Sequence, residues 1–568
     1  MTRTSPALVD RPERLRLVGQ RRRTLAMMHQ RLMLGMLIYA GIIAIIIVRI
    51  GGLAIFGGGD GRIASMNNVS VARADIVGRE QIPLASSIEA WTIAVQPQRV
   101  IGSKMALAEK LESLMPERDA GEYYDILTSE KTFVYLRRRA APSLVEAVNA
   151  LGEPGIAFDR ERDRLYPQTA LASHVLGFTD IDGKGAAGVE RSLDAELTDA
   201  GRDGAPIELS ISTRVQQALE HELGSAMTHF SAQGAAGVLM DLKTFEILAM
   251  TSLPDFNPND PAGATPEQMF NRATLGVYEL GSTYKPFTVA MAMDAGIITS
   301  LGQMYSCPDK LDIYGRTIRD THPYGRPCSV TEIMKESSNI GTAAIADQLG
   351  TARQKAFLKK MGFLDPVPVE LKERGRTIAP GNGWGPLETV TVGYGHGIAV
   401  TPLHLAMGYA TLFNGGVYHA PTILRRSKAN PLDKGRRVFT EDTSYRMRAL
   451  LRLVVTQGTG KKADAEGYRV GGKTGTAEKV INGRYSRRNV VNTFAGVFPI
   501  EDPRYVIVVM LDDPQPTKET YGFRTAGWNV APVVKKTVER VGPMLGVAPD
   551  KTKEPKMAEV LPFIHDEK

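Results

Sequence analysis

Three short polar motifs stand at the edges of apolar segments in the second half of the chain. They are Ser282-Thr283-Tyr284-Lys285, Ser337-Ser338-Asn339 and Lys473-Thr474-Gly475. Each motif alone is weak evidence, because ordinary serine and lysine usage produces the first spacing about once or twice in a chain of this length. Their occurrence together and in this order indicates a serine nucleophile with a lysine as its base.

The spacing of Ser282 and Lys285 explains how the serine would be activated. The pair stands where a helix is expected to begin, so the two side chains lie on one face, one turn apart. A lysine can accept the serine proton only when it is neutral, which requires burial and a neighbouring positive charge. Lys473 is the candidate for that neighbour, and the apolar residues after Lys285 are consistent with burial.

The other two motifs supply groups suited to a peptide substrate. Ser337 can relay the proton to a leaving amine, and Asn339 can both donate to and accept from a substrate amide. Lys473, Thr474 and Thr476 are expected to bind a carboxylate on the substrate.

A strand rich in glycine is predicted at the third motif. Gly471, Gly472 and Gly475 lack side chains, and glycines in an inner strand let a second backbone approach closely. A peptide substrate would then lie along this strand as an added strand. The backbone N–H groups of Ser282 and Thr476 are the candidates for an oxyanion hole.

Strands, many helices and again strands follow one another over residues 206–545, which predicts an α+β catalytic domain. Residues 57–205 hold no catalytic cluster and are interpreted as a non-catalytic pedestal, and residues 546–568 as a flexible tail. The main elements expected in the catalytic domain are a helix over 213–230, two strands within 235–250, strands over 493–500 and 504–513, and a closing helix over 530–545.

Positive charge is concentrated at the N-terminus. Residues 1–31 hold eight arginines against Asp10 and Glu13, a net charge of +6, whereas the whole chain carries +7. The remainder is therefore nearly neutral. Because a nucleic-acid-binding protein needs a basic face on a folded domain, no nucleic-acid partner is expected.

An uncharged apolar run at 32–48 follows this basic tail, and apolar residues continue to about 56. The run is long enough to span a membrane, and longer than the apolar region of about 7 to 15 residues of a cleaved signal peptide. We interpret residues 32–56 as an uncleaved signal anchor. The preceding arginines would hold residues 1–31 in the cytoplasm and export everything after about residue 57.

Cys307 and Cys328 are the only cysteines and lie 21 positions apart in the exported part. A disulfide that closes this short loop is one interpretation in an oxidising compartment. Two unpaired thiols, in a domain large enough to fold without a bridge, are the other. The histidines are scattered without a zinc-type spacing, so neither a metal site nor a cofactor is predicted.

The set of three motifs resembles that of the penicillin-binding proteins and serine β-lactamases. Within this family the chain is similar to class B penicillin-binding proteins, and especially to the FtsI-type transpeptidases of cell division. The likeness covers nearly the whole exported chain and the anchor. Stretches outside the motifs that look like the family are LYPQTALASHVLGF and GAAGVER within 165–191, LSISTRVQ at 209–216, LPDFNPN at 253–259, VGYGHGIAVTPLHLA at 392–406 and TAGWNVAPV at 525–533.

The resemblance implies a transpeptidase domain, an antiparallel sheet flanked by helices, that is preceded by a mixed pedestal module. It implies that Ser282 attacks the D-Ala-D-Ala bond of a peptidoglycan stem peptide, releases D-alanine and passes the acyl group to an amine of a second stem. Penicillins and other β-lactam antibiotics would acylate the same serine.

The implied partners are lipid II-derived glycan strands, a membrane glycosyltransferase of the FtsW type and other division proteins. The implied location is the bacterial inner membrane at the division septum, with a single span, a cytoplasmic N-terminus and a periplasmic catalytic domain.

Three segments depart from the family pattern. The usual R-G-x-I-x-D-R-N-G appears at 73–81 as RADIVGREQ, without the aspartate, asparagine and glycine. E-P-G-S is Glu279-Leu280-Gly281-Ser282, and T-G-E is Thr244-Phe245-Glu246. None of these changes removes a catalytic atom, but the first puts in doubt how the pedestal is coupled to its partners.

Several other functions use related motifs. A β-lactamase would need a deacylating glutamate with an asparagine four residues on, and Glu370, Glu373 and Glu388 have none there. A bifunctional class A protein would need a glycosyltransferase domain, for which residues 57–205 are short. An elongation-type class B transpeptidase, a D-alanine carboxypeptidase and a non-enzymatic penicillin-binding scaffold of the division complex stay open as alternatives.

Overall fold

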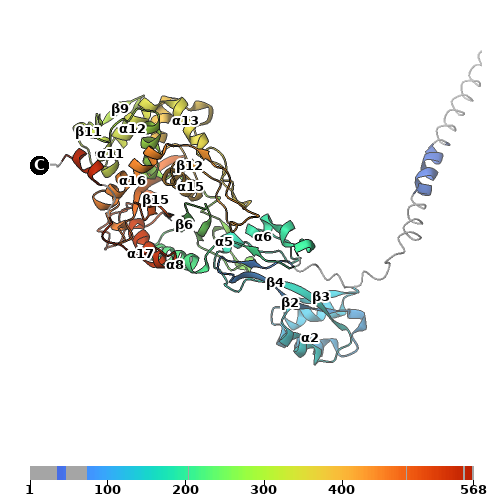
Figure 1. The fold of residues 1–568 in the computed structure, drawn as a ribbon. Helices are drawn as coiled ribbons and strands as arrows, with labels where there is room; N and C mark the ends of the chain where they lie inside the picture. Colours follow the sequence, from blue (N-terminus) through green and yellow to red (C-terminus); the bar gives the residue numbers. More distant parts are fainter. Residues whose placement is uncertain are drawn as a thin grey trace, which may run out of the picture. The chain divides into compact units, whose positions relative to one another are not determined.

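The computed structural model of the chain describes residues 33, 35–45, 73–202, 204–481, 483–553 and 557–565, in two compact units, 1–70 and 71–568 (Figure 1). Residues 35–45 of the first unit are helical. None of the helices among the described residues is both long and apolar enough to cross a membrane. The predicted cytoplasmic tail and most of the predicted anchor at 32–56 lie outside the described residues.

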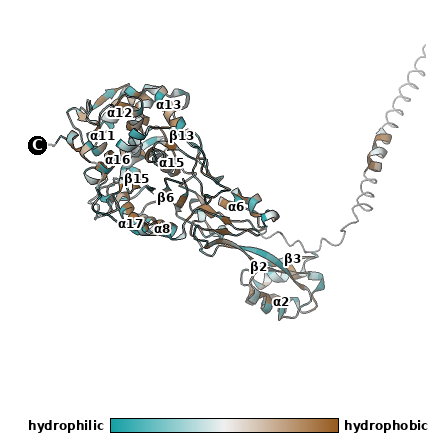
Figure 2. Ribbon diagram, in the orientation of Figure 1, coloured by the Kyte–Doolittle hydropathy of each residue, from teal (hydrophilic) through white to brown (hydrophobic). Residues whose placement is uncertain are grey.

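A small sheet with helices forms the N-terminal part of the second unit. Strand β2 is its longest element and pairs antiparallel with β1, β3 and β4, while β5 joins β1 in parallel. Strand β4 is largely hydrophilic (Figure 2). The helices within residues 104–149 pack on Ile93 and Val95 of β2 and form a small hydrophobic core with them. The elements are β1 (Ile76–Val77), β2 (Pro83–Val95), α2 (Lys104–Leu114), α3 (Ala120–Thr128), β3 (Val134–Ala140), α4 (Pro142–Asn149), β4 (Ile156–Leu165), α5 (Ser173–Leu176), α6 (Gly188–Ser192), α7 (Asp194–Leu197) and β5 (Ile207–Glu208).

The catalytic part is built on a five-stranded antiparallel sheet in the order β14-β15-β16-β6-β7. Successive side chains of β16 point to opposite faces of the sheet and enter two hydrophobic cores. Val506 and Val508 pack in one core, and Ile507 and Val509 pack in the other. This burial of both faces explains the unbroken apolar run of the strand. The strands are β6 (Gly234–Asp241), β7 (Ile247–Leu253), β14 (Gly471–Ile481), β15 (Arg484–Phe498) and β16 (Tyr505–Asp512).

Helices cover both faces of this sheet. On one face α8 and α17 pack side by side (Figure 1), and the other face carries the larger core around α10, α15 and α16. The helices are α8 (Thr213–His229), α9 (Pro266–Met269), α10 (Lys285–Asp294), α11 (Val330–Glu336), α12 (Asn339–Leu349), α13 (Thr351–Lys360), α14 (Pro386–Gly393), α15 (Pro402–Phe413), α16 (Glu441–Thr456) and α17 (Val530–Met544). Short strand pairs complete this part: β8 (Met304–Tyr305) with β11 (Cys328–Ser329), β9 (Leu311–Ile313) with β10 (Arg316–Ile318), and β12 (Val417–Tyr418) with β13 (Arg436–Arg437).

The α+β architecture and its main elements confirm the sequence prediction, with α8, β6, β7, β16 and α17 within a few residues of the expected ranges. Strand β15 is also present, but it begins at Arg484, nine residues before the predicted strand over 493–500. One detail was wrong. Strand β14 carries the third motif at the edge of the sheet and is not an inner strand. The hydrophobic pattern of a strand indicates only whether its two faces are covered. It does not indicate which other strands pair with the strand, or whether the strand lies at the edge of the sheet.

The C-terminal segment also differs from its prediction as a flexible tail. Two one-turn helices, Met557–Glu559 and Leu561–Phe563, flank Val560, which is fully buried. The carbonyl oxygen of Phe563 accepts a hydrogen bond of 2.7 Å from the Ser329 hydroxyl. A composition rich in Lys, Glu and Pro predicted disorder, but a few apolar residues are enough to dock this segment on the catalytic part.

Candidate active site

Ser282 lies in a single 3-10 turn, Gly281–Tyr284 (η4), that leads directly into α10. Gly281 has a φ of 54°, a left-handed conformation that favours glycine. Thr283, Tyr284 and Lys285 are buried, whereas Ser282 is partly exposed. The turn therefore presents the serine alone to solvent and directs the rest of the motif into the core.

Lys285 is completely buried, and its Nζ atom donates to both the carbonyl oxygen and the hydroxyl of Ser337, the latter at 3.1 Å. Ser337 ends α11 in a left-handed conformation with a φ of 63°. Such a conformation is uncommon for a residue with a side chain and is often found at functional sites. Among the described residues, the side-chain amine of Lys285 donates to Ser337, and only the backbone N–H of Lys285 donates to Ser282, at its carbonyl oxygen. Catalytic hydrogen bonds between a nucleophile and its base often tighten only in the complex with substrate.

The electrostatics of the site favour a neutral lysine next to the serine. Burial, followed by the positive charge of Lys473, holds the pKa of Lys285 well below its usual value, while Asp320 opposes the shift. Burial lowers the pKa of Lys473 to about 7, against the opposing effect of Glu336. His396 is kept neutral, because burial and then Lys285 lower its pKa to about 4. Burial and the charge of Lys473 thus both favour the neutral amine of Lys285, which is the form that can accept a proton.

The second motif joins two helices. Ser338 begins α12, and its Oγ accepts a hydrogen bond of 2.9 Å from the Gly341 N–H. The same hydroxyl donates to Asp320 at 2.6 Å. The partly exposed Asn339 donates from Nδ2 to the carbonyl oxygen of Arg319 at 3.1 Å. The asparagine amide is thus oriented by a loop that the sequence motif does not include.

The third motif forms a cluster with a threonine from another loop. The Nζ atom of Lys473 donates to the Thr474 carbonyl oxygen at 3.0 Å and to Thr459 Oγ1 at 3.4 Å. The hydroxyls of Thr459 and Thr474 are 2.7 Å apart. In contrast, Thr476 Oγ1 accepts a hydrogen bond of 3.0 Å from the Ala526 N–H. The cluster combines one buried ammonium group with two hydroxyls.

Strand β14 lies against η4 with almost no space between the two backbones. A Cβ atom at Gly475 would be 2.3 Å from the Leu280 carbonyl oxygen, and one at Gly281 would be 2.9 Å from the Thr476 carbonyl oxygen. Because the N–H and C=O of a strand residue point to the same edge, the Thr476 N–H also points toward η4. The glycines at 281 and 475 thus serve this contact, which brings Ser282 and Thr476 together.

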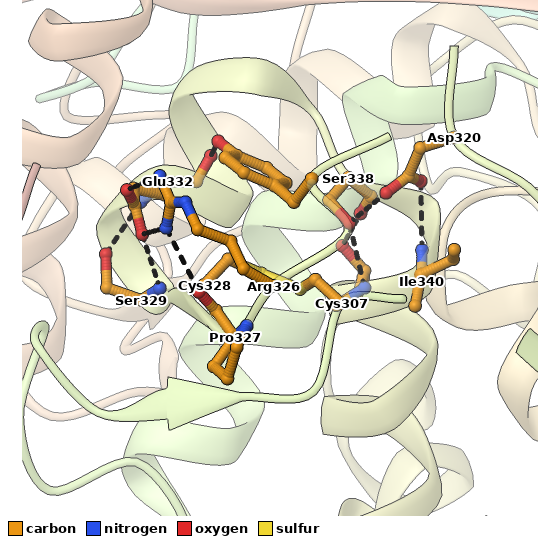
Figure 3. The surroundings of a disulfide bond; sticks show 12 residues. Cys307, Asp320, Arg326, Pro327, Cys328, Ser329, Glu332, Ser338 and Ile340 are labelled. Atoms are coloured by element: carbon orange, nitrogen blue, oxygen red, sulfur yellow. Dashed lines mark hydrogen bonds and ion pairs between the residues drawn. A yellow bond between two sulfur atoms is a disulfide. The ribbon is translucent and has the colours of Figure 1, made fainter. Parts of the chain in front are cut away.

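The cysteines are joined in a disulfide, with Cα atoms 5.9 Å apart (Figure 3). The sequence left a disulfide and two unpaired thiols open as interpretations, and the structure contains the disulfide. It connects the ends of the segment that carries Asp320.

The altered segment 73–81 is anchored by its charged residues. Arg73 forms an ion pair with the fully buried Glu190, and Arg79 one of 2.6 Å with Glu246 of the altered Thr244-Phe245-Glu246 turn. The carboxylate of Glu80 accepts from the Ser212 hydroxyl and from the Thr213 N–H at the start of α8. The segment that departs from the family pattern therefore connects the pedestal sheet to the catalytic part.

All three predicted motifs meet at one site, but two residues that hold them were missed. Asp320 and Thr459 lie 18 and 14 positions before their partners Ser338 and Lys473. Both are in loops without hydrophobic periodicity, and no local pattern in the sequence indicates their partners.

Comparisons with known proteins agree with this architecture. A family model for the penicillin-binding protein transpeptidase domain matches residues 235–538, and one for the penicillin-binding protein dimerisation domain matches residues 68–207. The probable peptidoglycan D,D-transpeptidase FtsI of Caulobacter vibrioides is 37% identical over 493 residues, which are 84% of this chain and 82% of that protein. The peptidoglycan D,D-transpeptidase FtsI of Escherichia coli K12 is 32% identical, over 81% of this chain and 82% of that protein.

A solved structure shows the same fold. The crystal structure of penicillin-binding protein 3 from Mycobacterium tuberculosis, complexed with aztreonam, has a TM-score of 0.67 and 25% sequence identity, and the match covers 86% of this chain and 98% of that one. The transpeptidase family model alone covers more than half of the chain. The chain therefore belongs to the penicillin-binding proteins, as a class B peptidoglycan D,D-transpeptidase of the FtsI type.

Proposed function

We propose that this enzyme cross-links peptidoglycan stem peptides through an acyl-enzyme on Ser282 during septal wall synthesis. The observation that carries the proposal is the environment of Lys285, which is fully buried, depressed in pKa and hydrogen-bonded to Ser337 beside a partly exposed serine. Lys285 forms no ion pair with a carboxylate in the described part of the chain, and a buried lysine of this kind is costly to a fold. Such perturbed groups are concentrated at active sites.

In the acylation step, Ser282 Oγ attacks the carbonyl carbon of the penultimate D-alanine while Lys285 takes the hydroxyl proton. The N–H groups of Ser282 and Thr476 stabilise the oxyanion that develops. Ser337, whose hydroxyl accepts a hydrogen bond from Lys285, relays the proton to the nitrogen of the terminal D-alanine. The peptide bond breaks and D-alanine leaves with that proton, so that the stem is left as an ester on Ser282.

Lys473 and Thr474 would hold the terminal carboxylate of the substrate, together with Thr476, and Asn339 would hold a backbone amide. A bound carboxylate favours the charged form of Lys473, whose pKa near 7 lets it carry a proton when substrate is present. In the second step an amine of another stem attacks the ester. Its proton returns through Lys285 to Ser282 Oγ, which leaves as the regenerated hydroxyl.

The test is the intact mass of the full chain in detergent after incubation with benzylpenicillin, followed over hours beside Ser282→Ala. A persistent one-to-one adduct, absent from the alanine variant, is expected. An adduct that clears within minutes would indicate a β-lactamase-like hydrolase, and no adduct would favour a non-enzymatic scaffold. A D-Ala-D-Ala peptide with and without an acceptor amine then separates transpeptidation from carboxypeptidase activity.

We propose further that residues 32–56 anchor the enzyme in the inner membrane, with residues 1–31 in the cytoplasm, a pedestal over 57–205 and a periplasmic catalytic domain over 206–545. The apolar run behind a cluster of arginines supports this topology. A glycosyltransferase of the FtsW type and other division proteins would be the partners. A functional fluorescent fusion should collect at midcell, and a fusion along the side wall would instead indicate an elongation role. Co-purification from membranes should recover such a glycosyltransferase.

A further inference from the structure

The segment between the two cysteines is a closed loop whose shape is fixed at its base and in its middle. At the base, Cys328 pairs with Tyr305 across β8 and β11, and the disulfide joins Cys328 to Cys307. In the middle, β9 and β10 form a hairpin, and Ile318 of β10 packs in a small core with Ile340 of α12. Asp320 follows two residues after β10, which leaves it little freedom.

The carboxylate of Asp320 accepts hydrogen bonds from the second motif and from Ile340, the residue that follows it (Figure 3). One oxygen accepts from the Ser338 hydroxyl at 2.6 Å, and the other accepts from the backbone N–H groups of Asn339 and Ile340, the latter at 3.1 Å. The neighbouring carbonyl of Arg319 accepts from the Asn339 side chain. Hydrogen bonds to an ionised carboxylate are about twice as strong as neutral ones. The loop therefore determines where α12 begins and where the asparagine amide points.

Ser337 connects this arrangement to the nucleophile. It precedes Ser338 directly, has a left-handed backbone conformation, and accepts both hydrogen bonds that Lys285 donates to the second motif. A shift of Ser338 and Asn339 would move the carbonyl and hydroxyl of Ser337, and with them the amine that takes the Ser282 proton. Asp320 is thus connected to Lys285 through the hydrogen bond to Ser338, the peptide bond to Ser337 and the hydrogen bonds of Ser337 with Lys285.

We propose that Asp320 is a positioning residue of the active site, which fixes the second motif and, through Ser337, the base Lys285, and that the Cys307–Cys328 bridge keeps Asp320 in place. The proposal rests on the proposed role of Ser282 as the nucleophile. It adds a loop outside the three motifs to the machinery that sets the acylation rate.

The first test measures acylation of the full chain in detergent by a fluorescent penicillin, with the binding constant and the acylation rate constant resolved separately. Asp320→Ala is expected to lower the acylation rate constant about 100-fold, since a misplacement of about 1 Å can cost that much, and to weaken binding, through Asn339, by a smaller factor. Tyr314→Phe is the matched control, because it removes a 2.7 Å hydrogen bond between the same loop and Asp347 of α12, away from the motif. It should stay within about twofold.

A fall of less than tenfold for Asp320→Ala, or an equal fall for Tyr314→Phe, would overturn the proposal. A wild-type chain that takes up no penicillin would instead contradict the proposed function. Melting curves establish that each variant is folded at the assay temperature.

The second readout is the pH dependence of acylation in Asp320→Asn, a variant that keeps the size of the side chain. The charged and titratable groups around Lys285 are Lys473 from β14, Asp320 from the loop and His396 after α14. Because the negative charge of Asp320 raises the pKa of Lys285, its loss should move the acidic limb of the rate profile to lower pH. A lower plateau with an unmoved limb would mean that Asp320 only supports the fold, and would overturn the positioning role.

The third test isolates the bridge. The paired variant Cys307→Ala with Cys328→Ala should lower the acylation rate constant about tenfold in the wild-type background and change it little in the Asp320→Ala background, since the bridge acts through Asp320. Effects that multiply in the triple variant would show an independent route and overturn this part of the proposal.

Discussion

Substitution of Gly475 by alanine tests the close contact between β14 and the turn that carries Ser282. The added Cβ would lie 2.3 Å from the Leu280 carbonyl oxygen, whereas such contacts stay beyond 3.0 Å, so the two backbones must separate by the difference, about 0.7 Å. Neither side can yield as a flexible side chain would, because both are backbone. Ser282 and Thr476 flank the contact and would move apart by a similar distance.

The expected result is an acylation rate constant about 10- to 100-fold lower, because geometric errors near 1 Å have costs of this size. The assay is fluorescent-penicillin labelling of the full chain over time at several concentrations, with a melting curve for each variant. Overpacking should also destabilise the fold by about 1–3 kcal/mol.

Gly375→Ala is the matched control for the steric clash. Its Cβ would lie 2.3 Å from the Leu275 carbonyl oxygen, outside the contact of β14 with the turn. It should lower the melting temperature while acylation stays within about threefold. Unchanged acylation in Gly475→Ala, or an equal loss of acylation in Gly375→Ala, would refute the reasoning that the contact of β14 with the turn sets the positions of the Ser282 and Thr476 N–H groups.

Three further perturbations have defined outcomes. Burial lowers the pKa of Lys473 to about 7, so above this pH the unfolded chain binds more protons than the folded chain. The free energy of unfolding of the wild type should therefore rise relative to that of Lys473→Met by roughly 1.4 kcal/mol per pH unit between pH 8 and 10. A difference that stays flat or falls with pH in denaturant titrations would contradict this. Glu80→Ala should cost about 1–2 kcal/mol in urea unfolding, because it removes the acceptor at the start of α8, and should leave acylation unchanged. Truncation after residue 553 should lower the melting temperature by about 5 °C, because Val560 and Phe563 pack on the catalytic part; an unchanged melting temperature would restore the interpretation as a flexible tail.

The sequence by itself determined the elements whose signal is local. The apolar run 504–513 and the periodic pattern at 213–230 predicted β16 and α8, because burial of one or two faces imposes a period on the residues of the element itself. The three motifs were recognisable for a related reason, since each places its polar groups within one turn or one strand. Their combined order was specific enough to predict the family and its fold.

Only the tertiary structure decided which distant groups complete these motifs. Asp320 and Thr459 have no local pattern that predicts Ser338 and Lys473 as their partners, and the edge position of β14 depends on pairing across the whole sheet. The cysteine spacing allowed a bridge, but only the pairing of β8 with β11 brings the two residues within reach. Local spacing constrains the geometry of neighbours in the chain, whereas hydrogen-bond partners and pKa shifts arise where packing removes water from groups that are far apart in sequence.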